Sequence, residues 1–349
     1  MLVNLKSQSA NTIRAIRLTV GLTFCIAIAF GFNWPLSFIA PVFTAKFLGT
    51  KKPKMPFKVL VAILLVGVVA FCSGILITSM FLPYPGVFIL ITTLLIFLVS
   101  YWSHSGGNEF VITMLLIGFT LVPMLALVHV EVANVVVTGF LFSFFIALLT
   151  TMLMHEVIPD NAGDVDGQQP AELKAELKPE LKPVETRFQL AVLSTIIIMP
   201  VLVFFLYFGL TSSLLILIFV AILAQKPDLL VGLKGSKALL VGNSLGGLFA
   251  IIAYSLLVIV PDFVFLILLF ASINIYFAKL TFSERPLAPI YAMAHSTIII
   301  LIAAGSLSDG GAGEKFYIRI LQIAAACAYI IFTTYLATPF LKRIENSNL

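Results

Sequence analysis

Few residues in this sequence could do chemistry, and one of them lies inside an apolar segment. His295 is near the middle of an apolar run, with Tyr291, Ser296 and Thr297 beside it. An ionisable side chain within a membrane marks a functional site by default, and histidine titrates near neutral pH. We therefore take His295 as a candidate proton-coupling residue. A neutral histidine that hydrogen-bonds to a neighbouring helix is an equally good interpretation.

A second set of candidates consists of basic residues at the ends of apolar segments. Arg14 and Arg17 are three residues apart and share one face of a helix. Any single one is typical of a membrane-surface anchor, but no Asp or Glu lies deep in an apolar segment, which argues against cation transport. The set predicts a substrate-binding entrance for anions, formed by Arg14, Arg17, Lys46, Lys58, Lys226, Lys234 and Lys237.

Enzymatic motifs are missing from the sequence. It has no Walker A loop, zinc-ligand spacing, serine elbow or dinucleotide fingerprint. Cys25, Cys72 and Cys327 lie in apolar runs and fit small apolar fillers. We therefore expect no catalytic residues, no metal and no cofactor, and an enzyme ranks last among the functions.

The composition sets the class of protein to which these candidates belong. Of 349 residues, 60% are apolar and 11% are charged, whereas soluble domains average about 45–50% and about 25%. So few charges cannot cover the surface of a soluble enzyme, a disordered protein or a nucleic-acid binder. The sequence therefore predicts an all-α, polytopic membrane protein. The N-terminal run resembles a signal peptide, but another apolar run follows at once, so we interpret it as an uncleaved first helix.

Twelve apolar segments are candidates for transmembrane helices, because crossing the hydrocarbon core takes about 20 residues. The second one is short and contains Pro35 and Pro41, which allows a bent or re-entrant segment. The twelve are 13–32, 35–50, 57–82, 85–103, 109–128, 132–154, 188–208, 210–225, 238–260, 262–279, 286–306 and 315–340.

The basic residues indicate the orientation of these segments. If both termini are cytoplasmic, every Lys and Arg except Lys315 and Arg319 falls on the cytoplasmic side. This agrees with the positive-inside rule. The net charge of +5 is therefore mainly an orientation signal and indicates no nucleic-acid partner.

The two halves of the chain resemble each other. A shift along the sequence places Lys58 on Lys237 and Gly67 on Gly246. Six spans per half is an even number, so the halves are predicted to be parallel repeats. The predicted domains are residues 1–154, a charged cytoplasmic linker over 155–186, and residues 187–349.

Small and polar residues within the spans have a packing interpretation. Gly242 and Gly246 are four residues apart, the spacing that lets two membrane helices approach closely. Asn243, Ser244 and Asn274 are expected to form hydrogen bonds between helices rather than to contact a ligand.

The clearest resemblance to a known family lies in the second half. Residues 219–227 end in Gln225, Lys226 and Pro227, and residues 235–247 contain Lys237 and a Gly-x-x-x-Gly segment. With a weaker match from Asn33 to Gly67, this resembles the fusaric acid resistance (FUSC)/aromatic acid exporter superfamily. The nearest relatives are its short members with a domain of unknown function (DUF2955-like).

The resemblance implies a transporter in the bacterial inner membrane that exports small organic, chiefly aromatic, anions. It also implies a periplasmic adaptor of the membrane-fusion type. The large cytoplasmic domains of the longer exporters are absent here, and only the 155–186 linker stands in their place. A passive anion channel, a membrane scaffold that transports nothing, and a homo-oligomer remain open alternatives.

Overall fold

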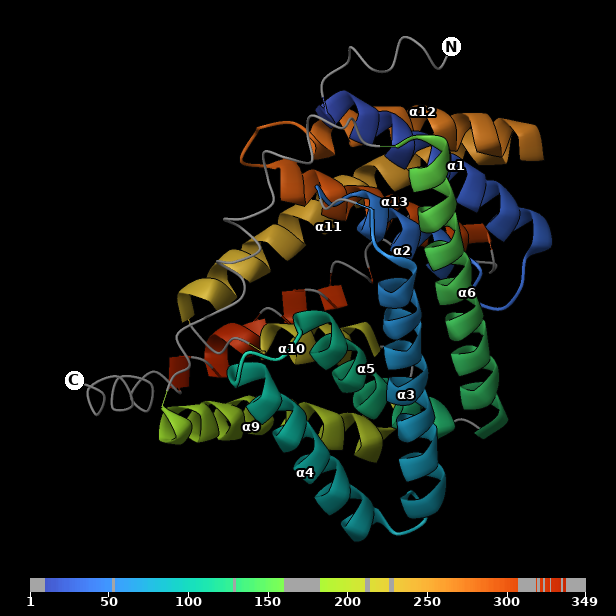
Figure 1. Ribbon diagram of the computed structural model, residues 1–349. Coiled ribbons are helices and arrows are strands. Elements are labelled where there is room, and N and C mark those ends of the chain that lie inside the picture. Colours follow the sequence, from blue (N-terminus) through green and yellow to red (C-terminus); the bar gives the residue numbers. More distant parts are fainter. Residues whose placement is uncertain are drawn as a thin grey trace. The chain divides into compact units, whose positions relative to one another are not determined.

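The chain is helical throughout the part that its computed structural model describes. That part comprises residues 10–51, 54–127, 130–159, 183–210, 214–225 and 229–306, with parts of 318–336. It is 86% helix, and these described residues contain no strand. Eight of the described helices are long and apolar enough to cross a membrane (Figure 1). Helices satisfy their own backbone hydrogen bonds in lipid, so this fold fits the polytopic membrane protein predicted from composition. Twelve spans and the repeat stay predictions.

The helices cluster into two compact units, and each unit combines segments from both halves of the sequence. Unit 1 comprises Met1–Leu64, Thr138–Leu173 and Ala238–Ile320, and unit 2 comprises Leu65–Val137, Lys174–Lys237 and Leu321–Leu349. Three of the described helices continue from one unit into the other: α3 (Phe57–Phe81), α6 (Val130–Val157) and α11 (Leu229–Ile259).

Unit 1 is built around a ring of four helices. Helix α1 packs against α2 and α12, α12 packs against α13, and α13 packs against α2. Their shared core includes Leu22, Ile26, Phe270 and Ile298. The bounds are α1 (Ala10–Phe32), α2 (Ile39–Leu48), α12 (Phe263–Thr281) and α13 (Ala288–Ser306).

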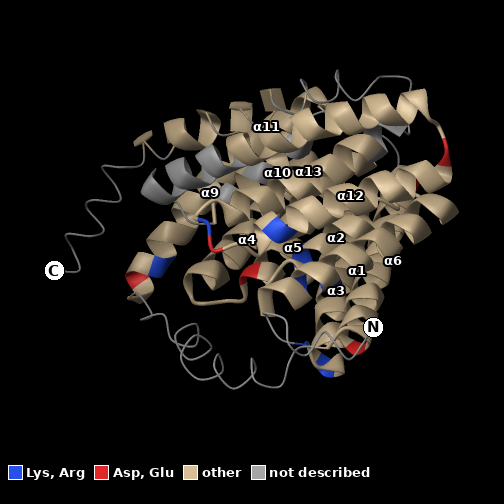
Figure 2. Cartoon of the chain, turned by 90° about the horizontal axis from the view of Figure 1, so that it is seen from above, with Lys and Arg blue, Asp and Glu red and all other residues tan. Residues whose placement is uncertain are grey.

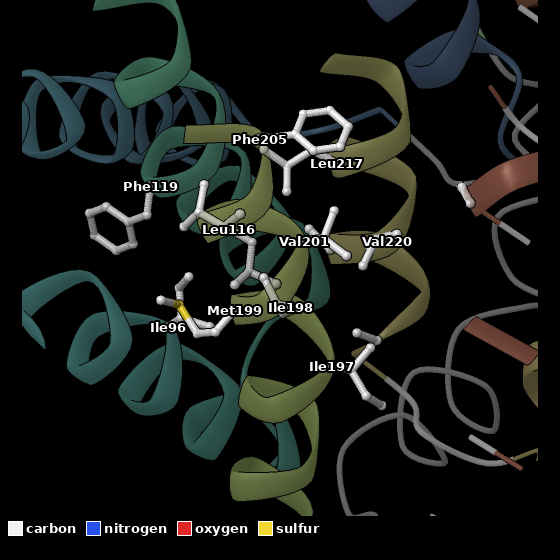
Figure 3. Close-up of a cluster of buried hydrophobic side chains, with 14 of the residues drawn as sticks. Ile96, Leu116, Phe119, Ile197, Ile198, Met199, Val201, Phe205, Leu217 and Val220 are labelled. Atoms are coloured by element: carbon white, nitrogen blue, oxygen red, sulfur yellow. The ribbon is translucent and has the colours of Figure 1, made fainter. Parts of the chain in front are cut away.

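Unit 2 is built around a second ring of four helices. Helix α9 packs against α10 and α4, α4 packs against α5, and α5 packs against α10. Figure 3 shows part of the apolar core of this unit, with Leu116, Ile198, Val201 and Leu217 among its side chains. The bounds are α4 (Pro85–His104), α5 (Glu109–Ala126), α9 (Val184–Phe208) and α10 (Leu214–Leu223).

Charged residues are sparse along the helices, which are mostly tan in Figure 2. Two described helices have a polar or charged side chain that caps their N-terminus. The Asn108 side chain accepts hydrogen bonds from the backbone N–H groups of Phe110 and Val111 at the start of α5. Asp262 accepts one from Phe265 at the start of α12. These caps satisfy N–H groups that have no partner within the helix.

The second helix of each half is short. Helices α2 and α10 have 10 residues each, which corresponds to about 15 Å, roughly half of the hydrocarbon core. Asn33 and Leu36 precede α2 and have positive φ angles of 44° and 60°. Such left-handed turns delay the start of a helix. The predicted segment 35–50 therefore contains only a short helix. In the second half, α11 begins at Leu229, nine residues before the predicted start of its segment at residue 238.

Candidate functional site

The two arginines of α1 are buried in unit 1. Arg14 is 6% exposed and Arg17 is 1% exposed. They share a face of α1 with the buried Gly21 and Cys25, because the four residues follow one another at intervals of three or four. The sequence alone does not predict which face of α1 is buried, because α1 is apolar on nearly every side.

Arg17 lies against the C-terminal end of α6. Its Nη1 donates a hydrogen bond of 3.2 Å to the backbone carbonyl of Ile158, which directly follows that helix. Carbonyl groups at a helix C-terminus have no partner within the helix and carry the negative end of its dipole. This end of α6 therefore stabilises a positive charge that is otherwise costly to bury.

Gly21 allows α2 and α6 to lie close to the arginine face of α1. A Cβ atom on Gly21 would lie only 2.6 Å from the side chains of Leu48 on α2 and Met154 on α6. One turn further along, the Thr44 hydroxyl donates a hydrogen bond of 3.3 Å to the Cys25 sulfur. The buried arginines thus have a closely packed apolar layer on one side.

A chain of polar side chains crosses another part of unit 1. The Asn274 amide donates a hydrogen bond of 2.9 Å to Thr23 Oγ1, and its Oδ1 accepts one of 2.7 Å from His295 Nε2. The His295 ring also stacks on Phe277, with 5.4 Å between the ring centroids. Asn274 and His295 are 0% and 2% exposed. These hydrogen bonds connect α1, α12 and α13 and confirm that Asn274 forms hydrogen bonds between helices, as expected.

Helices α11 and α13 are joined in the same way. The Thr297 hydroxyl donates a hydrogen bond of 3.0 Å to Asn243 Oδ1. A Cβ atom on Gly246 would lie 2.5 Å from the Ala294 carbonyl oxygen, and one on Gly242 would lie 2.9 Å from the Met293 sulfur. The glycine pair therefore lies at a close helix crossing, as its spacing predicts.

The predicted basic residues differ in how far they are buried. Lys46 and Lys58 are exposed, on α2 and at the start of α3, whereas Arg14 and Arg17 are buried. Lys234 and Lys237 fall within α11, and Lys226 lies outside the described residues.

One ion pair of unit 1 was not predicted from the sequence. Lys54 forms an exposed ion pair with Glu156 near the end of α6. Both residues fall on the predicted cytoplasmic side, so the same topology could have suggested the pair. In the part of the chain that the structure describes, no group of three His, Cys, Asp or Glu side chains could hold a metal ion.

Comparison with known proteins gives one match. The model of a family described as "Protein of unknown function (DUF2955)" matches residues 14–154. No curated protein matches the chain. No solved structure matches it. The matched region begins at Arg14, so it includes the arginine face of α1 and all of α2, and it ends at Met154, before the end of α6.

Proposed function

We propose that the protein is a transporter that exports small organic anions, chiefly aromatic ones, across the bacterial inner membrane. The observation that carries the proposal is the burial of Arg17, with Arg14 beside it, at the predicted cytoplasmic end of α1. A guanidinium binds a carboxylate through two parallel hydrogen bonds, which suits a buried anion site. A charged side chain is costly to bury, and Arg17 is 1% exposed near the start of a membrane helix, which favours a functional reason for its presence.

The path of the anion follows from the placement of the basic residues. Exposed Lys46 and Lys58 attract anions to the entrance, and the buried arginines bind the carboxylate. We place Lys226, Lys234 and Lys237 in the corresponding entrance of the second half.

A parallel repeat accounts for the packing within each unit. In unit 1, helices α1 and α2 of the first half pack against α12 and α13 of the second. In unit 2, helices α9 and α10 of the second half pack against α4 and α5 of the first. The first two helices of one half thus contact the fourth and fifth of the other half in both units. Short α2 and α10 take corresponding places, and such pairs occur near the binding sites of repeat transporters.

His295 is the proposed proton-sensitive group. It is buried and hydrogen-bonded to Asn274, which connects it to Thr23 on α1. A change in its protonation would alter these hydrogen bonds, and so the packing of α13 against α12 and the link through Asn274 to α1. A periplasmic adaptor of the membrane-fusion type is the proposed partner.

The test is benzoate flux through purified protein in proteoliposomes. The double variant Arg17→Ala/Lys46→Ala should lower the initial rate about tenfold or more, as expected for the loss of charged hydrogen bonds. Lys279→Ala is the matched control, because Lys279 is an exposed basic residue of unit 1 outside the proposed site.

Two further arms make the result specific. Arg17→Lys keeps the charge but loses the planar fork, and should retain part of the flux if its fold is intact by thermal unfolding. Wild-type flux in the double variant would remove the arginine site from the mechanism. Flux that follows only the Nernst potential of benzoate would identify a passive channel, and no flux in the wild type would favour a scaffold.

A further inference from the structure

A second basic site lies in unit 2, at the start of α9. Arg187 Nη1 donates a hydrogen bond of 3.4 Å to the hydroxyl oxygen of Ser105, which directly follows α4. Next to Ser105 in sequence, His104 Nε2 lies 3.2 Å from the hydroxyl oxygen of Ser194 on α9. Two side-chain contacts therefore join the end of α4 to the first half of α9.

The guanidinium of Arg187 has hydrogen-bonding capacity to spare. Its Nε–H is buried and has no hydrogen-bond partner, and its contact with Ser105 is long. Among the residues that the structure describes, no carboxylate forms an ion pair with Arg187. A buried donor without an acceptor costs about 1–3 kcal/mol, and more when it is charged. The side chain as a whole is half-buried, so an anion from outside can reach the guanidinium.

A buried hydroxyl group on α4 also lacks a hydrogen-bond partner. Ser100 is 3% exposed, and its Oγ has no hydrogen-bond partner. It precedes His104 by one helical turn and lies on the same side of α4. Unsatisfied polar groups are rare in membrane-spanning helices, because each one is costly in an apolar environment.

Aromatic rings adjoin this polar cluster. Phe97 and Tyr101 on α4 stack with their centroids 6.4 Å apart, and Phe97 meets Phe188 of α9 edge to face at 5.4 Å. Tyr101 is one turn before Ser105, and Phe188 directly follows Arg187. Aromatic contacts therefore join α4 and α9 at residues next to, or one turn from, Ser105 and Arg187.

We propose that Arg187 and Ser105 form an oxyanion-binding site in unit 2. The occupant is a single carboxylate or phosphate group, which accepts hydrogen bonds from the Nε–Nη edge of Arg187 and from the Ser105 hydroxyl. Because Nε is buried, binding includes a small change of the Arg187 rotamer. The same chemistry is offered by a soluble carboxylate and by the phosphate of an anionic lipid. The site shares no residue with the proposed entrance at Arg17 and stands whether or not the protein transports anions.

The experiment measures thermal unfolding of the full chain in nanodiscs of phosphatidylcholine. Benzoate is titrated in one arm, and phosphatidylglycerol is added to the nanodiscs in the other. A ligand that binds the folded state raises Tm. We expect at least one arm to raise the Tm of the wild type, and the responding arm identifies the source of the oxyanion.

Variants then locate the binding site. Arg187→Gln should weaken the response about tenfold or more in apparent affinity, and Ser105→Ala should weaken it less. Arg285→Gln, at an exposed arginine of unit 1, should behave as the wild type. Arg187→Lys, which keeps the charge, replaces Arg187→Gln if that variant does not fold. No response in either arm, or a response that the substitutions at Arg187 and Ser105 leave unchanged, would overturn the proposal.

Discussion

Gly118 offers a direct test of the helix packing in unit 2. A Cβ atom at this position would lie 2.5 Å from the carbonyl oxygen of Ala70 and 3.1 Å from its carbonyl carbon. Ordinary van der Waals contact begins at 3.4 Å, so Gly118→Ala must separate α3 and α5 by about 0.9 Å. The obstacle is backbone, which cannot rotate away as a flexible side chain could.

The magnitude follows from two opposing effects. Inserting a methyl group into a closely packed contact costs about 1–3 kcal/mol, while alanine is favoured over glycine in a helix by up to about 1 kcal/mol. Because the obstacle is backbone, we take the upper end of the packing cost, and the difference predicts that Gly118→Ala lowers the free energy of unfolding by about 2 kcal/mol.

The assay is equilibrium unfolding of purified protein in mixed detergent micelles, followed by circular dichroism. Gly86→Ala is the matched control, because nothing lies within 4 Å of a Cβ atom at Gly86. It should be neutral or slightly stabilising. A Gly118→Ala variant that unfolds at the same denaturant concentration as the wild type, or a Gly86→Ala variant that is equally destabilised, would contradict a close backbone contact at Gly118.

Three further predictions concern polar contacts and topology. Asn274→Leu removes two interhelical hydrogen bonds and should lower the free energy of unfolding by about 1 kcal/mol. Ser272→Ala, on the exposed side of α12, should leave it unchanged. Equal unfolding midpoints for the two variants would contradict this prediction. Trp34→Phe removes the 2.8 Å hydrogen bond to Ser143 and should lower stability by about 1 kcal/mol in the same assay. In a cysteine-free background, a membrane-impermeant thiol reagent should label Glu284→Cys only from the cytoplasmic side. It should label Asp262→Cys only from the opposite side. Labelling of both variants from the same side would refute the topology.

Helix boundaries were predictable where turn residues interrupt the apolar pattern. The predicted segments 57–82, 85–103 and 109–128 correspond to Phe57–Phe81, Pro85–His104 and Glu109–Ala126. Prolines at the start of α4 and a capping Asn108 before α5 fix these ends.

Helix boundaries were less predictable where a helix extends beyond its apolar, membrane-spanning segment. Helix α11 begins at Leu229, nine residues before the predicted span, and includes Lys234 and Lys237. Hydropathy detects the apolar core of a helix but not a polar extension of it. The delayed start of α2 depends on left-handed turns at Asn33 and Leu36, for which neither residue gives the strong signal of glycine.

The candidate site was predictable by residue type but not by arrangement. Arg14 and Arg17 stand out because charges are rare in α1, yet only the fold shows that both are buried. Lys46 is on the exposed side of its helix, and nearly uniform apolar helices carry no periodic signal that would assign such faces. The hydrogen bond from His295 to Asn274 joins residues on different helices, a pairing that one sequence does not encode in its spacing. Transport and the proton role of His295 stay predictions.

The most direct test of the proposed function is the initial rate of benzoate movement in proteoliposomes with and without a proton gradient. We expect a saturable rate above that of empty vesicles. The gradient should increase this rate, and Arg17→Ala/Lys46→Ala should lower it about tenfold or more. A rate in wild-type proteoliposomes equal to that of empty vesicles, with the protein folded and correctly inserted, would contradict the proposed function.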